Sequence, residues 1–164
     1  MEGYFPNVVL TTHQNQRVRF YDDIVKGKII LVNFMFTSCQ RFCPRTTSNL
    51  ARVQAALGPR LGRDVFLYSI TLDPARDTPE VLKRYAQTVG AKPGWLFLTG
   101  TSEDIELLRR KLGVYDPDPL IDADKTQHAG IVVLGNEATG DWGAVPGLIK
   151  PAAIVQAVQR VVRR

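Results

Sequence analysis

The order of strand and helix patterns predicts an α/β protein, a three-layer sandwich in which helices cover both faces of a mixed central sheet. Runs rich in β-branched and aromatic residues alternate with helical patterns from residue 29 onward. Two late β-rich runs, 130–134 and 141–144, are separated by a short turn, so antiparallel strands are expected beside parallel ones. Two further short runs near the start predict an N-terminal β-hairpin extension.

The N-terminal hairpin is the first predicted element. Residues 7–11 and 17–21 are predicted as strands around a polar turn at 13–16. His13 lies in that turn, so we expect it to be a solvent-exposed loop residue.

The central strand follows. Residues 29–36 form an apolar run that is typical of a buried strand, and it ends at Thr37 and Ser38, two good helix caps. Apolar residues at helical spacing predict a helix over 44–57. A second β-rich run predicts a strand over 65–71.

The second half of the chain continues the alternation. The segment Asp77-Thr78-Pro79 predicts a helix start, because proline is favoured at the first helical position. Thr101 is expected to cap another helix. The predicted elements are a helix over 79–89, a strand over 95–98, a helix over 102–112, a polar loop over 115–125, the two hairpin strands, and a closing helix over 151–162.

Length and composition restrict the class of protein. A chain of 164 residues fits one domain, 1–164, with a core that needs no disulfide scaffold. The net charge of +5 comes without a basic tract interleaved with aromatics, which argues against nucleic-acid binding. No apolar run reaches the ~18 residues that span a bilayer, and the start lacks the features of a signal peptide. Such a start fits a cytosolic protein, or one whose leader or anchor is missing from this chain.

Cys39 and Cys43 are the only cysteines, and they lie where the central strand meets the next helix. Residues four positions apart share one face of a helix, so the two sulfurs could form a disulfide or bind one metal ion. A helix N-terminus lowers thiol pKa values and so favours either use. The alternative is a pair of inert buried cysteines. We favour redox or metal chemistry, because the pair is predicted at a strand-to-helix corner rather than within an apolar face.

A histidine could supply a third ligand, although a single histidine beside a strand is more often structural. His128 directly precedes the strand predicted over 130–134, and it would lie near the cysteines if that strand neighbours the central one. Thiolates with imidazole favour copper, as Cu(I) or Cu(II). Zinc is the rival, but a structural zinc site normally has four protein ligands and the chain has no third cysteine. A nearby carboxylate or Met35 could complete the site.

The order of strand, cysteine and helix resembles the thioredoxin fold, and two motifs resemble one family with that fold. Residues 36–44, FTSCQRFCP, and residues 70–79, ITLDPARDTP, together with a late histidine, are similar to the SCO/SenC proteins. The resemblance implies that Cys39, Cys43 and His128 are copper ligands. It also implies that Asp73 and Asp77 belong to an acidic stretch beside the metal site, where they would support the site or its fold.

The family resemblance implies a function. It implies a monomeric metallochaperone that assists assembly of the Cu(A) centre of cytochrome c oxidase. Its partner would be the oxidase subunit that carries Cu(A) or another copper chaperone. Members are tethered at the periplasmic face of the inner membrane, so an anchor is expected outside this chain. The family usually has proline after the first cysteine, where this chain has Gln40.

Two redox alternatives stay open. A thiol-disulfide oxidoreductase that keeps partner cysteines reduced would use Cys39 and Cys43 as catalytic residues. A peroxidase of the peroxiredoxin type would require threonine at position 36, where this chain has Phe36.

Overall fold

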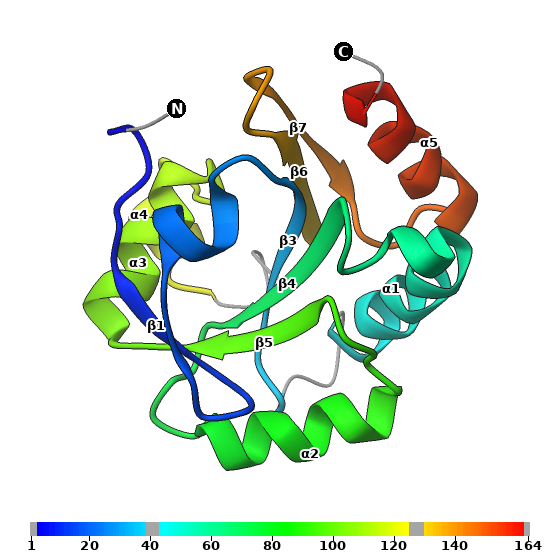
Figure 1. The fold of residues 1–164 in the computed structure, drawn as a ribbon. Coiled ribbons are helices and arrows are strands. Elements are labelled where there is room, and N and C mark those ends of the chain that lie inside the picture. Colours follow the sequence, from blue (N-terminus) through cyan, green and yellow to red (C-terminus); the bar gives the residue numbers. More distant parts are fainter. Residues whose placement is uncertain (1–2, 39–42, 125–129, 163–164) are drawn as a thin grey trace.

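A seven-stranded mixed sheet forms the middle layer of the protein, with strand order β2-β1-β5-β4-β3-β6-β7 (Figure 1). The computed structural model describes residues 3–38, 43–124 and 130–162, with Cys43 and Pro44 described by their backbone alone. Strands β3, β4 and β5 run parallel, and their neighbours pair antiparallel. The strands are β1 (Val9–Thr12), β2 (Arg17–Arg19), β3 (Ile29–Met35), β4 (Val65–Thr71), β5 (Trp95–Thr99), β6 (Ile131–Asn136) and β7 (Asp141–Pro146).

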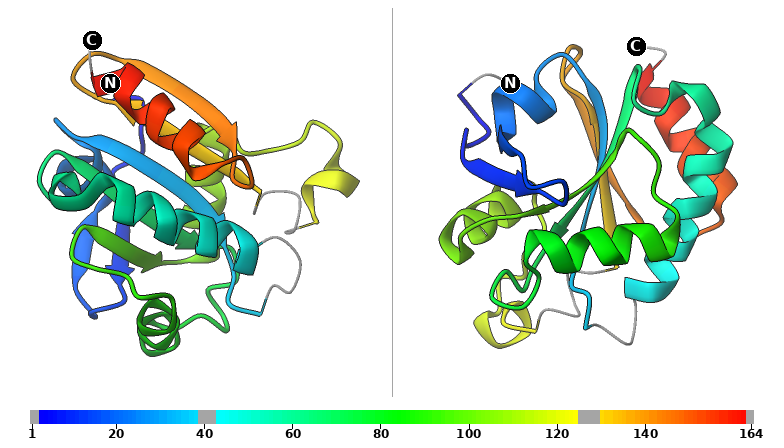
Figure 2. Two further views of the ribbon diagram at one scale, coloured as in Figure 1. Left: turned by 90° about the vertical axis from the view of Figure 1, so that its right-hand side faces the viewer. Right: turned by 60° about the horizontal axis from the view of Figure 1, so that its bottom comes forward.

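Helices cover both faces of this sheet, which makes the three layers (Figure 2). The apolar sides of α1, α2 and α5 pack on one face. The other face is covered by α3, by the N-terminal segment and by a π-helical turn at Phe20–Val25. The helices are α1 (Cys43–Leu57), α2 (Pro79–Val89), α3 (Ser102–Lys111), α4 (Pro119–Asp122) and α5 (Pro151–Val162).

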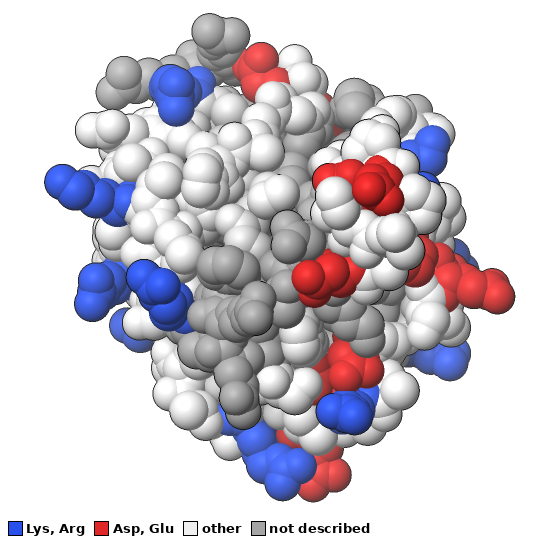
Figure 3. All heavy atoms as spheres, turned by 180° about the vertical axis from the view of Figure 1, so that it is seen from behind, with Lys and Arg blue, Asp and Glu red and all other residues white. Residues whose placement is uncertain are grey.

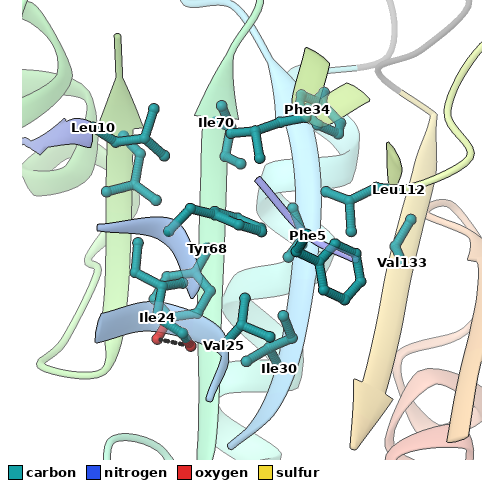
Figure 4. Packing of buried hydrophobic residues seen from close by; sticks show 14 of the residues in the cluster. Phe5, Leu10, Ile24, Val25, Ile30, Phe34, Tyr68, Ile70, Leu112 and Val133 are labelled. Atoms are coloured by element: carbon teal, nitrogen blue, oxygen red, sulfur yellow. Dashed lines mark hydrogen bonds between the residues drawn. The ribbon is translucent and has the colours of Figure 1, made fainter. Parts of the chain in front are cut away.

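The core on the α3 side is shown in Figure 4, where Phe34 and Ile70 lie side by side on the neighbouring strands β3 and β4. Tyr68 is buried in this core, and its hydroxyl donates a hydrogen bond of 3.1 Å to the carbonyl oxygen of Ile24. Burial raises the pKa of Tyr68. Two separate cores on a central sheet hold the strand ends at fixed positions, and the candidate site lies at these ends.

The predicted fold class is confirmed, and most elements lie within one or two residues of their expected bounds. The N-terminal hairpin is present, and it joins the main sheet because β1 pairs with β5 through Thr11 and Thr99. The prediction of a loop over 115–125 was wrong in one respect. It contains the short helix α4, whose cap is Asp118, with Pro119 at the first helical position. No helix in the described ranges has both the length and the apolar character that crossing a membrane requires.

His13 was predicted to be exposed, and the structure contradicts this. Its backbone N–H donates to the carbonyl oxygen of Phe97 over 2.8 Å, and its Nδ1 accepts a hydrogen bond of 3.1 Å from the N–H of Phe97. The ring is half-buried and lies edge-on to the Phe97 ring. Partial burial is the main cause that lowers the pKa of His13, and the nearby charge of Lys83 also lowers it. His13 therefore extends the pairing of β1 with β5 as a neutral side chain.

We expect the stability of the protein to depend on pH through His13. A histidine whose pKa is lowered by folding contributes stability that is complete above its unfolded pKa of about 6.5 and is lost as the pH falls below it. Lowering the pH from 7.5 to 5 should therefore reduce the free energy of unfolding of the wild type more than that of His13→Gln. Urea unfolding at each pH measures this difference. His128 is present in both proteins, so the difference isolates His13. Identical pH dependence in the two proteins would contradict this role.

Candidate metal centre

The carboxyl ends of β3 and β4 lie side by side, because the two strands pair in parallel with Met35 opposite Thr71. The N–H of Leu72 also donates to the carbonyl oxygen of Met35 over 2.7 Å, which continues the pairing beyond the strands. Two residues after Met35 comes Thr37, and Cys39 follows it. In parallel sheets this edge is where ligand sites form.

The strand that follows His128 also reaches this edge. β6 pairs antiparallel with β3, and Val132 lies opposite Asn33, so β6 begins where β3 approaches its end. The condition on which the histidine prediction depended is therefore met, since β6 neighbours the central strand. Cys39 and His128 themselves lie outside the described residues, and Cys43 is described only as the first residue of α1. Their assignment as ligands stays a prediction.

Asp77 is the most informative of the described site residues. It is 1% exposed, and its carboxylate accepts three hydrogen bonds from the ends of two strands. The Thr37 N–H donates over 3.0 Å, the Thr71 hydroxyl over 2.7 Å, and the Thr37 hydroxyl makes a short contact with the other carboxylate oxygen. A buried carboxylate is tolerated only with such partners. Asp77 thus connects the ends of β3 and β4, and its partner Thr37 lies two residues before Cys39.

The structure confirms the helix start predicted at Asp77-Thr78-Pro79 and gives its residues different roles. Thr78 is the capping residue, because its side chain accepts from the N–H of Val81, and Pro79 is the first helical residue. The side chain of Asp77 instead points back to the two strands. Thr37 and Thr71 were not predicted as functional residues. Their signal in the sequence, a threonine at each strand end, is too common to single them out.

Asp73 lies at the same edge with a different environment. Its N–H donates to the Thr71 hydroxyl over 3.0 Å, and its carbonyl oxygen accepts from the N–H groups of Arg76 and Asp77. Its partly buried carboxylate lies 3.8 Å from Nε of the exposed Arg76. Asp73 therefore shapes the turn that places Asp77 under the strand ends.

A buried ion pair holds the segment that leads toward His128. The guanidinium of Arg109, 2% exposed, donates to both carboxylate oxygens of Asp122 over 2.7 and 2.9 Å and to the carbonyl oxygen of Val114 over 2.9 Å. The bond to Asp122 is the main cause that raises the pKa of Arg109, and burial opposes it. A hollow of about 390 Å³ beside this pair reaches Leu72 at the end of β4. The segment before His128 is thus fixed to α3 as far as Asp122.

Acidic residues are concentrated in this segment. Four aspartates occur within nine residues of a chain whose net charge is +5, and they are Asp116, Asp118, Asp122 and Asp124. On the face of the protein opposite to the view of Figure 1, most acidic side chains lie toward the right, mixed with Lys and Arg, whereas the left margin carries only Lys and Arg (Figure 3). Local negative charge favours the approach of a cation. Within the described ranges, however, no three His, Cys, Asp or Glu side chains form a group that could hold a metal ion.

Comparison with known proteins assigns the family. The SCO1/SenC family model matches residues 6–163, so this chain belongs to the SCO1/SenC family. Among its relatives is a Stutzerimonas stutzeri protein named for copper binding, 31% identical over 98% of this chain and 76% of its own length. Protein sco1 of Schizosaccharomyces pombe is 33% identical over 67% of this chain. The chain spans less than half of that protein and of two Rickettsia relatives.

Solved structures show the same fold. The crystal structure of a SCO1/SenC family lipoprotein from Bacillus anthracis matches with a TM-score of 0.78 and 26% identity, over 96% of this chain and 94% of that one. Yeast Sco1 with copper bound matches with a TM-score of 0.74 at 21% identity, over 99% of this chain and 95% of that one. A further neighbour, BsSco, is described as having a disulfide switch and as a member of the Sco family of cytochrome c oxidase assembly proteins. It matches with a TM-score of 0.74 at 23% identity, over 94% of this chain and 90% of that one.

Proposed function

We propose that this protein is a copper metallochaperone that holds one copper ion through the thiolates of Cys39 and Cys43 and the imidazole of His128. The observation that carries the proposal is the convergence of three chain segments at one sheet edge. β3 runs toward Cys39, α1 begins at Cys43, and β6, which follows His128, pairs with β3. Membership of the SCO1/SenC family and the copper-bound structure of yeast Sco1 support the choice of metal.

The cargo, on this proposal, is delivered to the oxidase subunit that carries Cu(A), at the periplasmic face of the bacterial inner membrane. The description of a neighbour as a cytochrome c oxidase assembly protein supports the partner, and that of another as a lipoprotein supports the location. Asp77 would hold the turn before Cys39 through Thr37. Asp73 would shape the turn after β4 that places Asp77.

The redox state of the two cysteines provides the test. Copper binding requires free thiolates, and a disulfide between Cys39 and Cys43 removes them. Reduced protein titrated with Cu(I) against a competing chelator should bind one equivalent, and protein oxidised beforehand should bind far less. Equal uptake by both forms, or none by reduced protein, would contradict the proposal.

A second function, thiol-disulfide exchange with a partner protein, is favoured by one observation, the disulfide switch described for BsSco. Exchange needs only the cysteine pair. His128→Ala should therefore lower copper affinity while leaving the rate of exchange with a dithiol unchanged. Absence of exchange with any dithiol would exclude this second function.

A further inference from the structure

One side-chain amide connects the helix that begins at Cys43 with the strand that follows His128. Asn49 lies in the second turn of α1, and its Nδ2 donates to the carbonyl oxygens of Gly147 and Ile149 over 2.8 and 2.7 Å. Both acceptors belong to the connection between β7 and α5. The N–H of Gly147 in turn donates to the carbonyl oxygen of Gly130 over 2.8 Å. Two hydrogen bonds in series thus join α1 to Gly130, two residues after His128.

Close packing at Gly147 supports the same connection. A Cβ atom built on Gly147 would lie 2.6 Å from Cγ2 of Thr46 and 3.4 Å from the carbonyl oxygen of Gly130. Thr46 is fully buried in the first turn of α1, so it has little room to move. The helix, the connection and the start of β6 are therefore in direct contact. In Figure 2, α1 and α5 lie side by side along this contact.

We propose that Asn49 is a positioning residue for copper binding, which fixes the separation between α1 and β6. The inference rests on the proposed function. The two thiols belong to the segment around the start of α1, whereas the imidazole precedes β6. The distance between thiolates and imidazole therefore depends on how these two elements are held together. Metal ligands must be held within about 0.5 Å of their productive geometry, and a fixed contact between the elements provides this.

Asn49→Ala should therefore bind Cu(I) about tenfold more weakly, in the range found when groups that support metal ligands are removed. Its rate of thiol-disulfide exchange should stay at the wild-type value, because exchange does not require the histidine. If Asn49→Ala does not fold, Asn49→Ser retains one hydrogen-bond donor and should show a smaller loss. An unchanged copper affinity in the folded variant would overturn the inference.

Gln54 offers a matched control on the same helix. Its amide also bonds backbone groups of a distant connection, donating to the carbonyl oxygen of Gly90 over 3.1 Å and accepting from the N–H of Lys92 over 2.8 Å. That connection joins α2 to β5, and β5 pairs with β1 and β4 rather than with β6. Gln54→Ala should lower stability to a similar extent in urea unfolding while keeping wild-type copper affinity. Equal loss of affinity in both variants would assign the effect of Asn49 to general destabilisation and overturn its positioning role.

A double-mutant cycle with His128 separates positioning from other effects. If Asn49 acts by setting the position of the imidazole, its replacement should cost nothing further in His128→Ala. Full additivity of the two losses would overturn the inference and leave the proposed function intact. Wild-type copper affinity in His128→Ala alone would instead remove His128 from the proposed ligand set, and with it the inference.

Discussion

Cys39→Ala and Cys43→Ala are each expected to abolish the uptake of one copper ion by the reduced protein. On the proposed ligand set, each variant removes one of two soft thiolates, and the remaining thiolate with one imidazole leaves copper two ligands. Cu(I) is a soft ion that prefers soft thiolate ligands, so the loss of one thiolate weakens its binding. The measurement is copper per protein after dialysis against a competing Cu(I) chelator, with thiol content checked in parallel.

Met35→Leu is the control for this pair. Met35, at the end of β3, carries a thioether sulfur in addition to the two cysteine thiols. Its side chain is completely buried in the core that α1 covers. Leucine and methionine have similar volumes, so the substitution should lower the free energy of unfolding by less than about 1.5 kcal/mol. Copper uptake should be retained. Stoichiometric uptake by either cysteine variant would contradict the proposed ligand set.

Asp77→Ala is expected to lower the free energy of unfolding by about 3 kcal/mol, because it leaves the buried hydroxyl of Thr71 and the partly buried donors of Thr37 without their acceptor. Each buried donor without a partner costs about 1–3 kcal/mol. The loss also frees the chain two residues before Cys39, so we expect copper affinity to fall about tenfold, as for other groups that support metal ligands. Urea unfolding of the copper-free reduced protein measures the first effect, and chelator competition measures the second.

Glu80→Ala is the matched control for charge. Glu80 is an exposed carboxylate three residues away, in the first turn of α2. Its removal changes the net charge equally and should change stability by less than about 1 kcal/mol. Asp77→Asn keeps one acceptor oxygen, so it should lie between the wild type and Asp77→Ala. If Asp77→Ala were no less stable than Glu80→Ala, the role assigned to the Asp77 hydrogen bonds would be wrong.

Elements with strong local signals were predicted well. The helix start at Thr78 and Pro79 and the strand Val65–Thr71 agree with the structure, because capping, proline geometry and β-branched runs act over a few residues. The short helix α4 was missed because four residues show no helical period. The π-helical turn at Phe20–Val25 was missed because its apolar residues resemble the end of a strand.

The residues of the candidate site also differ in how well the sequence predicts their roles. Cys39 and Cys43 stand out in the sequence because they are the only cysteines and lie four positions apart. The DPARDTP motif stands out because its charged residues and prolines occur within seven positions. His13 was misjudged because its partner, Phe97, is 84 residues away. For the same reason, nothing near Asn49 or Arg109 in the chain indicates that they bond Gly147 and Asp122.

The chemistry available to this protein, two thiols and a histidine on an α/β framework, can be read from its residues alone. The tertiary structure decided that β6 lies beside β3, that Asp77 is buried between two strand ends, and that Asn49 links α1 to the start of β6. The physical reason is range. Residue types and local periodicity act along the chain, whereas the bonds of Thr37 to Asp77 and of Asn49 to Gly147 form only after packing brings together residues 40 and 98 positions apart.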